Sequence, residues 1–336
     1  MREAEVVGEE RIVACLHGDR HADLLLQRLK LPQRLGHPPL AIERLSRENQ
    51  ASRGAVLLVH GLAQNRYTWR CSSRSLSGWL AQAGFDVYNL ELRGHGLSRS
   101  YGAKNATAFH DYVEDLCRAA SACDRPPFVI GHSLGGAAAI GASTQVPLAG
   151  LVHLAGVYTF ATRNRTLRAL CKLSLRLERL LMLSPARVST GWAGEVLGQL
   201  YSVSDIAGYG FPIAGWTPGS MERELVEERL ALGFDWESVE VWLQLCKWAA
   251  GEPLAYGDAF AHVDIPLLVM AGDHDVLAHP VDARACYDAS GSTDRTLVLF
   301  DKFQNQVHWG HVDLILGKKA PEETWPVLLT WLERRC

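Results

Sequence analysis

Short apolar runs alternate with longer amphipathic segments along two stretches of the chain. Runs typical of buried strands occupy 55–60, 85–92, 127–133, 148–156, 265–275 and 296–300. Segments with the apolar spacing of helices lie between or after them, at 75–84, 109–123, 134–143, 283–290 and 320–334. Strands that alternate with helices predict a parallel sheet covered by helices on both faces, and wholly apolar strands suit such burial.

The alternation stops between residues 158 and 261, where the chain is rich in leucine and helical in character. A structureless loop of that length is uncommon in a compact domain. We therefore predict a helical cap, residues 158–261, inserted into a core formed by 1–157 and 262–336. Its apolar side chains are expected mainly to form the cap's own core, and in part an apolar pocket. They include Trp192, Trp216, Trp236, Trp242 and Trp248.

The first fifty residues carry a weaker pattern. Residues 10–18 and 23–32 are predicted to pair as antiparallel strands at one edge of the sheet. Residues 34–50 are predicted to form a connecting loop.

Composition places the chain among globular proteins with a full apolar core. Hydrophobic residues make up 48% of the 336 residues and charged residues 21%. The net charge of −3 offers no electrostatic reason to expect a nucleic acid as partner. Basic residues between 163 and 179 alternate with leucines, which favours the solvated face of an amphipathic helix over a polyanion site.

Neither a leader nor a membrane span is indicated by the sequence. The N-terminus is acidic and lacks the apolar core of a signal peptide, and no run reaches about 18 uncharged apolar residues. The 8 cysteines include no CxxC pair, so neither a zinc site nor a redox motif is expected. We interpret them as reduced cysteines and expect a cytoplasmic location.

The motif GHSLGG, residues 131–136, lies between an expected strand and an expected helix. It matches the G-x-S-x-G pattern, in which a sharp turn projects a serine hydroxyl above the edge of a sheet. Gly131 and Gly135 remove side chains that would collide in such a turn. Ser133 is therefore the candidate nucleophile, and the backbone N–H of Leu134 is a candidate donor to an oxyanion.

A serine hydroxyl needs a base to take its proton, and a histidine oriented by a carboxylate is the usual base. In hydrolases with this turn, the acid and then the histidine follow the serine along the chain. Asp275 and His311 occur in that order, on loops after expected strands. We favour Asp275 over Asp273 because the acid usually lies a few residues beyond its strand.

Several histidines compete for the role of the base. We favour His311 over His308 because a glycine precedes His311 and a helix-like apolar segment follows it. His274 and His279 lie closer to the acid along the chain than a residue of a partner loop should.

A second oxyanion donor is expected from the loop that follows the strand at 55–60. The N–H of Leu62 is the candidate, and His60 is expected to shape this loop rather than to transfer protons. The glycines of RGHG, residues 93–96, are compatible with a phosphate site, but we interpret this segment as a structural turn.

Together these motifs resemble the α/β-hydrolase superfamily. LLVHGLAQNRYTW, LELRGHGLSR, GHSLGG and AGDHDVLA occur in the family's order, and the likeness extends from about Ala55 to the C-terminus. The tail GHVDLILGKKAPEETWPVLLTWL is similar to the histidine-bearing tail of acid lipases and polyhydroxyalkanoate synthases. The resemblance implies an α/β-hydrolase fold with a mostly parallel, doubly wound sheet and an inserted helical cap. It also implies a triad of Ser133, Asp275 and His311, and an oxyanion hole made by Leu62 and Leu134.

The residue at the centre of GHSLGG narrows the chemistry. A serine stands where the synthases have a cysteine and where epoxide hydrolases and dehalogenases have an aspartate. We therefore expect hydrolysis of a small-molecule or lipid-like carboxylic ester with an apolar acyl or alcohol group. No metal and no organic cofactor is expected to take part. Cleavage of a thioester or an amide, acyl transfer, and ligand binding without turnover are the alternatives.

Overall fold

Eleven strands form one mixed sheet in the part of the chain that the structure describes, and two short strands pair separately. This computed structural model describes residues 4–183, 188–189 and 215–336. Its 11-stranded sheet has the order β13-β12-β9-β8-β4-β7-β3-β2-β1-β6-β5. The first six strands of that order run parallel, as predicted. They are β4 (Ala55–Val59), β7 (Asp86–Glu91), β8 (Phe128–His132), β9 (Gly150–Leu154), β12 (Leu267–Gly272) and β13 (Arg295–Phe300).

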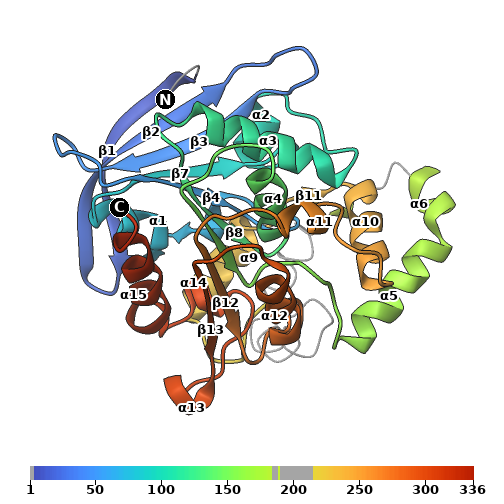
Figure 1. Ribbon diagram of the computed structural model, residues 1–336. Coiled ribbons are helices and arrows are strands. Elements are labelled where there is room, and N and C mark those ends of the chain that lie inside the picture. The colour runs from blue at the N-terminus through green and yellow to red at the C-terminus, as the bar shows by residue number, and fades with distance from the viewer. Residues whose placement is uncertain (1–3, 184–187, 190–214) are drawn as a thin grey trace.

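Helices cover both faces of this sheet, so it has an apolar core on each side (Figure 1). One core contains residues of α3 (Phe109–Ala122), α4 (Leu134–Ser143) and α12 (Pro280–Ala289). The other contains residues of α1 (Leu76–Gln82), α14 (Asp313–Leu316) and α15 (Ala320–Glu333). The predicted doubly wound arrangement is thereby confirmed. Short elements complete the frame: η1 (Arg66–Thr68), β5 (Arg70–Cys71), β6 (Arg74–Ser75), α2 (Gly96–Ser100) and α13 (Lys302–Asn305).

The N-terminal strands extend the sheet beyond its parallel part. β1 (Glu5–His17) and β2 (Arg20–Leu31) form an antiparallel hairpin, which confirms the predicted strand pair. The prediction of a connecting loop over 34–50 is wrong, because β3 (Leu40–Ser46) lies inside it and pairs with both β2 and β7.

Glu43 and Arg44 at the centre of β3 break its apolar run, so its sequence does not predict a buried strand. Glu43 is only 3% exposed, and its carboxylate meets the guanidinium of Arg70 at 2.9 Å and that of Arg66 at 3.4 Å. Both arginines belong to a later segment of the chain. The residues that neutralise Glu43 therefore become neighbours only when the sheet has formed.

Helices make up most of the described part of the insertion between β9 and β12. They are α5 (Arg165–Arg176), α6 (Glu178–Leu183), α9 (Arg223–Leu232), α10 (Val239–Ala249) and α11 (Gly257–Phe260), with the short strands β10 (Val188–Ser189) and β11 (Trp236–Glu237). α5 and α10 pack side by side at one end of the molecule, with α6 beyond them (Figure 1). Trp192 and the other residues between 190 and 214 lie outside the described residues.

The insertion shares both apolar cores of the sheet. Trp248 on α10 packs edge-on against Phe109 of α3, with ring centroids 4.8 Å apart. Trp216 lies in the core on the other face of the sheet. These two tryptophans therefore do not form a separate core of the insertion, contrary to the expectation for most of its apolar side chains. Trp236 is 38% exposed, and Trp242 donates a hydrogen bond to Ser174 at 3.1 Å.

Two further findings concern the cysteines and the possibility of a membrane-spanning helix. All 8 cysteines are free. Among the described residues, none of the helices combines the length and the apolar character that crossing a membrane requires.

Replacing Glu43 by alanine is expected to destabilise the protein by about 2 kcal/mol. The reason is that Arg66 and Arg70 would each lose the carboxylate of Glu43, which neutralises them against the sheet. Glu10→Ala is the matched control, since Glu10 pairs with Arg28 at 2.5 Å between side chains that are 48% and 42% exposed. That exposed pair should be worth about 0.5 kcal/mol or less. Urea unfolding of both variants measures the difference, and equal losses would contradict the role given to Glu43.

Candidate active site

Ser133 occupies a sharp turn between β8 and α4. Its backbone has φ 56° and ψ −124°, a conformation that non-glycine residues rarely adopt and that costs about 1–3 kcal/mol. The flanking glycines are required by space: a side chain on Gly135 would collide with the carbonyls of Val59 and His60, and one on Gly131 with the backbone of Gly135. The turn therefore lies directly against the end of β4, and the two glycines avoid collisions in it.

His311 and Asp275 form a buried pair on the two loops that follow β13 and β12. Nδ1 of His311 lies 2.7 Å from Oδ2 of Asp275, and the two residues are 2% and 0% exposed. Oδ1 of Asp275 accepts hydrogen bonds from the N–H groups of Leu277 and Ala278, at 2.8 and 2.9 Å. A carboxylate so placed accepts the Nδ1 proton of the imidazole, which leaves a lone pair on Nε2. That Nε2 is buried and has no hydrogen-bond partner within the described part of the chain.

His132 connects this pair to the turn of Ser133. Its ring lies 4.5 Å from that of His311, and its Nε2 is 3.1 Å from the backbone oxygen of His311. Because a carbonyl only accepts, Nε2 of His132 carries the proton and donates it. Burial, and then the nearby His311, hold the pKa of His132 well below its usual value. His132 is therefore neutral and fixes the backbone of His311 next to β8.

Sequence reasoning did not find the role of His132. The residue stands inside GHSLGG, directly before Ser133, so its importance could be suspected from the motif. The loop that it contacts is 179 residues further along the chain, and no local pattern identifies that loop.

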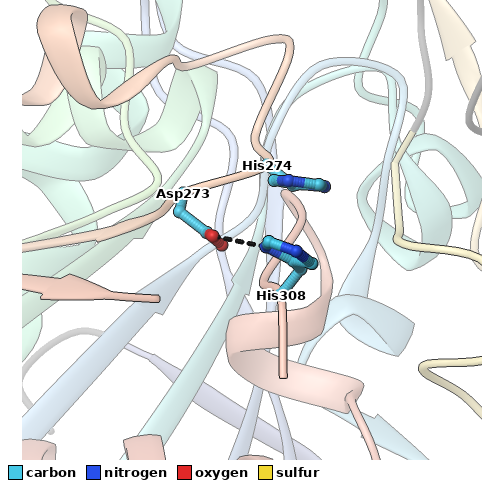
Figure 2. A group of neighbouring side chains, drawn as sticks. All are labelled: Asp273, His274 and His308. Carbon is cyan, nitrogen blue, oxygen red and sulfur yellow. Dashed lines mark hydrogen bonds and ion pairs between the residues drawn. The ribbon is translucent and has the colours of Figure 1, made fainter. Parts of the chain in front are cut away.

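The two rival residues, Asp273 and His308, pair with each other. Oδ2 of Asp273 lies 2.6 Å from Nδ1 of His308, while its Oδ1 accepts the N–H of Trp309 at 2.8 Å. The ring of His308 stacks on that of His274, with centroids 3.6 Å apart (Figure 2). His279 accepts the N–H of Val281 at 3.2 Å and so caps α12.

Distance does not distinguish the two Asp–His pairs, but burial and neighbours do. The side chains of His308 and Asp273 are 34% and 18% exposed, whereas those of His311 and Asp275 are 2% and 0% exposed. A buried imidazole beside His132 is also next to the turn of Ser133. Of the two pairs, the one formed by His311 and Asp275 therefore contacts His132, the residue before Ser133.

The loop after β4 reaches the same turn. A side chain on Gly61 would come within 2.7 Å of Cβ of Ser133, so Leu62 begins where the two segments touch. His60 is fully buried, and its ring bridges the carbonyl of Gly61 at 3.0 Å and the N–H of Leu92 at 3.2 Å. Burial, followed by the nearby His95, holds the pKa of His60 well below its usual value. A neutral ring that makes two hydrogen bonds to the backbone fits the loop-shaping role predicted for His60.

The insertion holds this loop from the other side. The N–H of Ala63 donates to Oε2 of Glu237 at 3.0 Å, and the carbonyl of Ala63 accepts the N–H of Asp235 at 2.8 Å. Glu237 is 2% exposed and also accepts a hydrogen bond from the hydroxyl of Tyr112 at 2.5 Å. Burial raises the pKa of Glu237, but the nearby imidazole of His95 and the hydrogen bond from Tyr112 outweigh burial and lower it overall. Sequence reasoning missed Glu237, which has no motif around it.

The RGHG segment serves structure. The guanidinium of Arg93 is held by the buried carboxylate of Asp115 at 2.8 Å and by Asp111 at 2.9 Å. His95 lies 3.6 Å from Glu237, inside the buried network below the loop after β4. With its cation neutralised inside the protein, this turn has no free charge for a phosphate.

Asp313 fixes the loop of His311 to the insertion. It accepts hydrogen bonds from the N–H of Gly310 at 2.7 Å, the N–H of Thr217 at 2.9 Å and the hydroxyl of Ser220 at 2.8 Å. Burial raises the pKa of this carboxyl to about 6, although the three hydrogen bonds oppose the shift. Asp313 follows His311 closely in the sequence, but its partners at 217 and 220 are visible only in the structure.

Comparison with known proteins identifies a family and a fold. The profile described as Alpha/beta hydrolase family matches residues 56–316. An uncharacterised abhydrolase domain-containing protein from Dictyostelium discoideum is 23% identical over 285 residues, which cover 83% of this chain but only 26% of that protein. Lipase member K from Homo sapiens is 22% identical over 328 residues, covering 84% of this chain and 80% of the relative.

A solved structure shares the fold. The crystal structure of monoacylglycerol lipase from Paleococcus ferrophilus matches with a TM-score of 0.61 and 21% identity, over 88% of this chain and 99% of that one. At this level of identity the match shows a common architecture.

The raised pKa of Asp313 predicts how stability changes with pH. The folded state binds this proton more tightly than the unfolded state, whose pKa is near 3.8. The stability that the group contributes is therefore full below pH 3.8 and is lost as the pH rises through about 6. Asp313→Asn does not titrate, so the free energy of unfolding of the wild type minus that of the variant should be about 1 kcal/mol larger at pH 5 than at pH 7. Urea unfolding at both pH values tests this, and a difference that is independent of pH would contradict it.

Proposed function

The chain belongs to the alpha/beta hydrolase family, and we propose that it is a serine hydrolase that cleaves a carboxylic ester through an acyl-enzyme. The observation that carries this proposal is the buried pair of Asp275 and His311, attached through His132 to the turn of Ser133. A strained turn and a buried, oriented imidazole are both costly, and a serine nucleophile needs both.

In the proposed reaction, Nε2 of His311 takes the proton of the Ser133 hydroxyl as its oxygen attacks the ester carbonyl. Asp275 keeps the imidazole oriented and stabilises its positive charge. The tetrahedral intermediate collapses, and His311 returns the proton to the departing alcohol. A water molecule then attacks the acyl-enzyme, again losing its proton to His311, and the carboxylic acid leaves as Ser133 is reprotonated.

The backbone N–H groups of Leu62 and Leu134 are the proposed oxyanion hole. Leu134 is the first residue of α4, and Leu62 follows the glycine that touches Ser133. One such donor contributes about 3–4 kcal/mol to stabilising the transition state in related sites. Glu237 and Asp235 hold the backbone of Ala63, the residue after Leu62. The insertion therefore contributes to the site by positioning the loop of Leu62.

Residues 158–261 are proposed to act as a cap whose outer face meets lipid-like substrate. Leu170, Leu173 and Leu177 share one face of α5 and its end, and are 38%, 51% and 40% exposed. Lys172 and Arg176 flank this apolar face, and both are exposed. Apolar side chains bordered by cations suit the surface of an anionic lipid aggregate.

One protein of the same fold is a monoacylglycerol lipase, and we propose a lipid-like ester as the substrate of this chain as well. The proposed chemistry uses no metal and no organic cofactor. The 8 free cysteines fit the cytoplasmic location that the sequence predicts.

Substitutions in the two Asp–His pairs should have very different effects on activity. Ser133→Ala and His311→Ala are expected to lower kcat for p-nitrophenyl butyrate by about 10⁴-fold or more, and Asp275→Asn by a similar factor. Asp273→Asn and His308→Ala are the matched controls and should change kcat less than tenfold. A fluorophosphonate probe should label the wild type at Ser133.

The outcomes separate the competing functions. Labelling at Ser133 without turnover of any ester, thioester or amide would favour acyl transfer, and no labelling would favour ligand binding without catalysis. Loss of activity in Asp273→Asn but not in Asp275→Asn would overturn the assignment of the acid.

The exposed leucines of α5 should matter only for aggregated substrate. The double variant Leu173→Glu/Leu177→Glu is expected to hydrolyse a long-chain ester in anionic vesicles at least tenfold more slowly, because acidic groups would face the lipid surface. Hydrolysis of dissolved p-nitrophenyl butyrate should stay within twofold of the wild type. Phe303→Glu is the control, since Phe303 is 96% exposed but lies on α13. Equal losses on both substrates would contradict the proposed role.

A further inference from the structure

A second group of potential ligands lies beside the proposed catalytic pair. Asp273, His274 and His308 each offer one ligand atom, and these atoms all lie within 4.8 Å of one another. Figure 2 shows the carboxylate of Asp273 pointing at the ring of His308, with the ring of His274 stacked above it. All three residues are partly exposed, so an ion from solvent can reach them.

We propose that Asp273, His274 and His308 bind one divalent transition-metal ion, of the class of Ni²⁺, Co²⁺ or Zn²⁺. Two imidazoles and one carboxylate are a donor set that suits these borderline cations, whereas Mg²⁺ and Ca²⁺ prefer oxygen ligands alone. Metal–ligand distances of about 2.0–2.2 Å place the donors of one ion roughly 3–4 Å apart. The three donors lie within 4.8 Å of one another, so side-chain rotations can bring them to that spacing. The hydrogen bond of 2.6 Å between Asp273 and His308 would open as the ion enters, and water would complete the coordination.

The arrangement of the three residues before binding favours this role. The near-parallel rings of His274 and His308 have centroids 3.6 Å apart and an interplanar angle of 19°. One ligand nitrogen of each ring lies within 4.8 Å of the other and of the carboxylate of Asp273. Oδ2 of Asp273 already forms a hydrogen bond of 2.6 Å with His308, and Oδ1 of Asp273 accepts a hydrogen bond from the N–H of Trp309. A bound cation would add an attraction to the carboxylate of Asp273.

The ion would join the two loops that carry the proposed acid and base. Asp273 and His274 precede Asp275 on the loop after β12, and His308 precedes His311 on the loop after β13. The loops already touch, since the N–H of His274 donates to the carbonyl of Trp309 at 2.9 Å. A metal bridge would hold them together more firmly in the folded state. The inference concerns binding and does not rest on the proposed hydrolase activity.

Calorimetric titration of the full chain, freed of metal by chelation and dialysis, tests the site. NiCl₂ is expected to bind in a 1:1 ratio to the wild type and at least tenfold more weakly to His274→Ala, His308→Ala and Asp273→Asn. Asparagine can still accept the N–H of Trp309, so the last variant removes charge and keeps that contact. MgCl₂ should give no saturable heat.

Two control variants address other ligands. His21→Ala removes an exposed histidine from β2, and Cys336→Ser removes an exposed thiol from the C-terminus. Both should bind Ni²⁺ as the wild type does. Binding that survives unchanged in His274→Ala and His308→Ala, or that is lost in Cys336→Ser, would overturn the proposal, as would the absence of saturable binding to the wild type.

Thermal unfolding gives an independent measurement. An ion present at 100 times its Kd and bound only to the folded state should raise the Tm of a protein of this size by about 4 °C. The shift should appear in the wild type and in His21→Ala, and be absent in His274→Ala. Equal shifts in all three proteins would show that Ni²⁺ acts elsewhere.

Discussion

The backbone at Ser133 is the constraint on which the rest of the site depends. Ser133 has a positive φ where β8, α4 and the end of β4 meet without side chains between them. Gly135 lies against the carbonyls of β4, and Gly136 lies against Gly156 at the end of β9. A twisted parallel sheet with helices on both faces can supply such close contacts, because the carboxyl ends of its strands converge at one edge. The energy stored in the turn is offset by the two apolar cores that press the helices onto the sheet.

Charge is placed around this turn in layers that differ in burial. Asp275 and His311 form an inner pair next to His132, and Asp273 and His308 form an outer pair from the same two loops. The two hydrogen bonds have nearly equal length, so their geometry alone does not decide their chemistry. Exclusion of water decides it, because a buried imidazole keeps its orientation and its unpaired nitrogen. A partly exposed imidazole can instead form hydrogen bonds with water. The outer pair can therefore have a different function.

The insertion is part of the same machinery rather than a separate body. Trp248 lies in the apolar core on one face of the sheet and Trp216 in the core on the other face. Glu237 holds the loop after β4, and Asp313 accepts hydrogen bonds from residues 217 and 220. Glu237 and Asp313 are both buried carboxylates, and each accepts hydrogen bonds from backbone N–H groups of a loop that borders the site. Burial of a charge is costly unless its acceptors are filled, so these contacts favour one arrangement of the loops over its alternatives.

Local patterns were sufficient for much of the molecule. The apolar runs identified all six parallel strands, and GHSLGG located the turn of Ser133, because a strand, a sharp turn and a helix each leave a mark within a few residues. The order of the acid and histidine along the chain was also enough to name Asp275 and His311, together with their rivals. β3 was missed because Glu43 is neutralised by Arg66 and Arg70, which are distant in sequence.

Tertiary structure alone decided which groups meet. The sequence contains Asp273 and Asp275, His308 and His311, but only folding shows that they pair in two separate layers. It likewise brings His132 to the backbone of His311, and Glu237 to the loop of Leu62. The physical reason is that burial and hydrogen bonding between distant segments depend on the relative position of whole strands and helices, whereas turns and periodicity depend on neighbours along the chain.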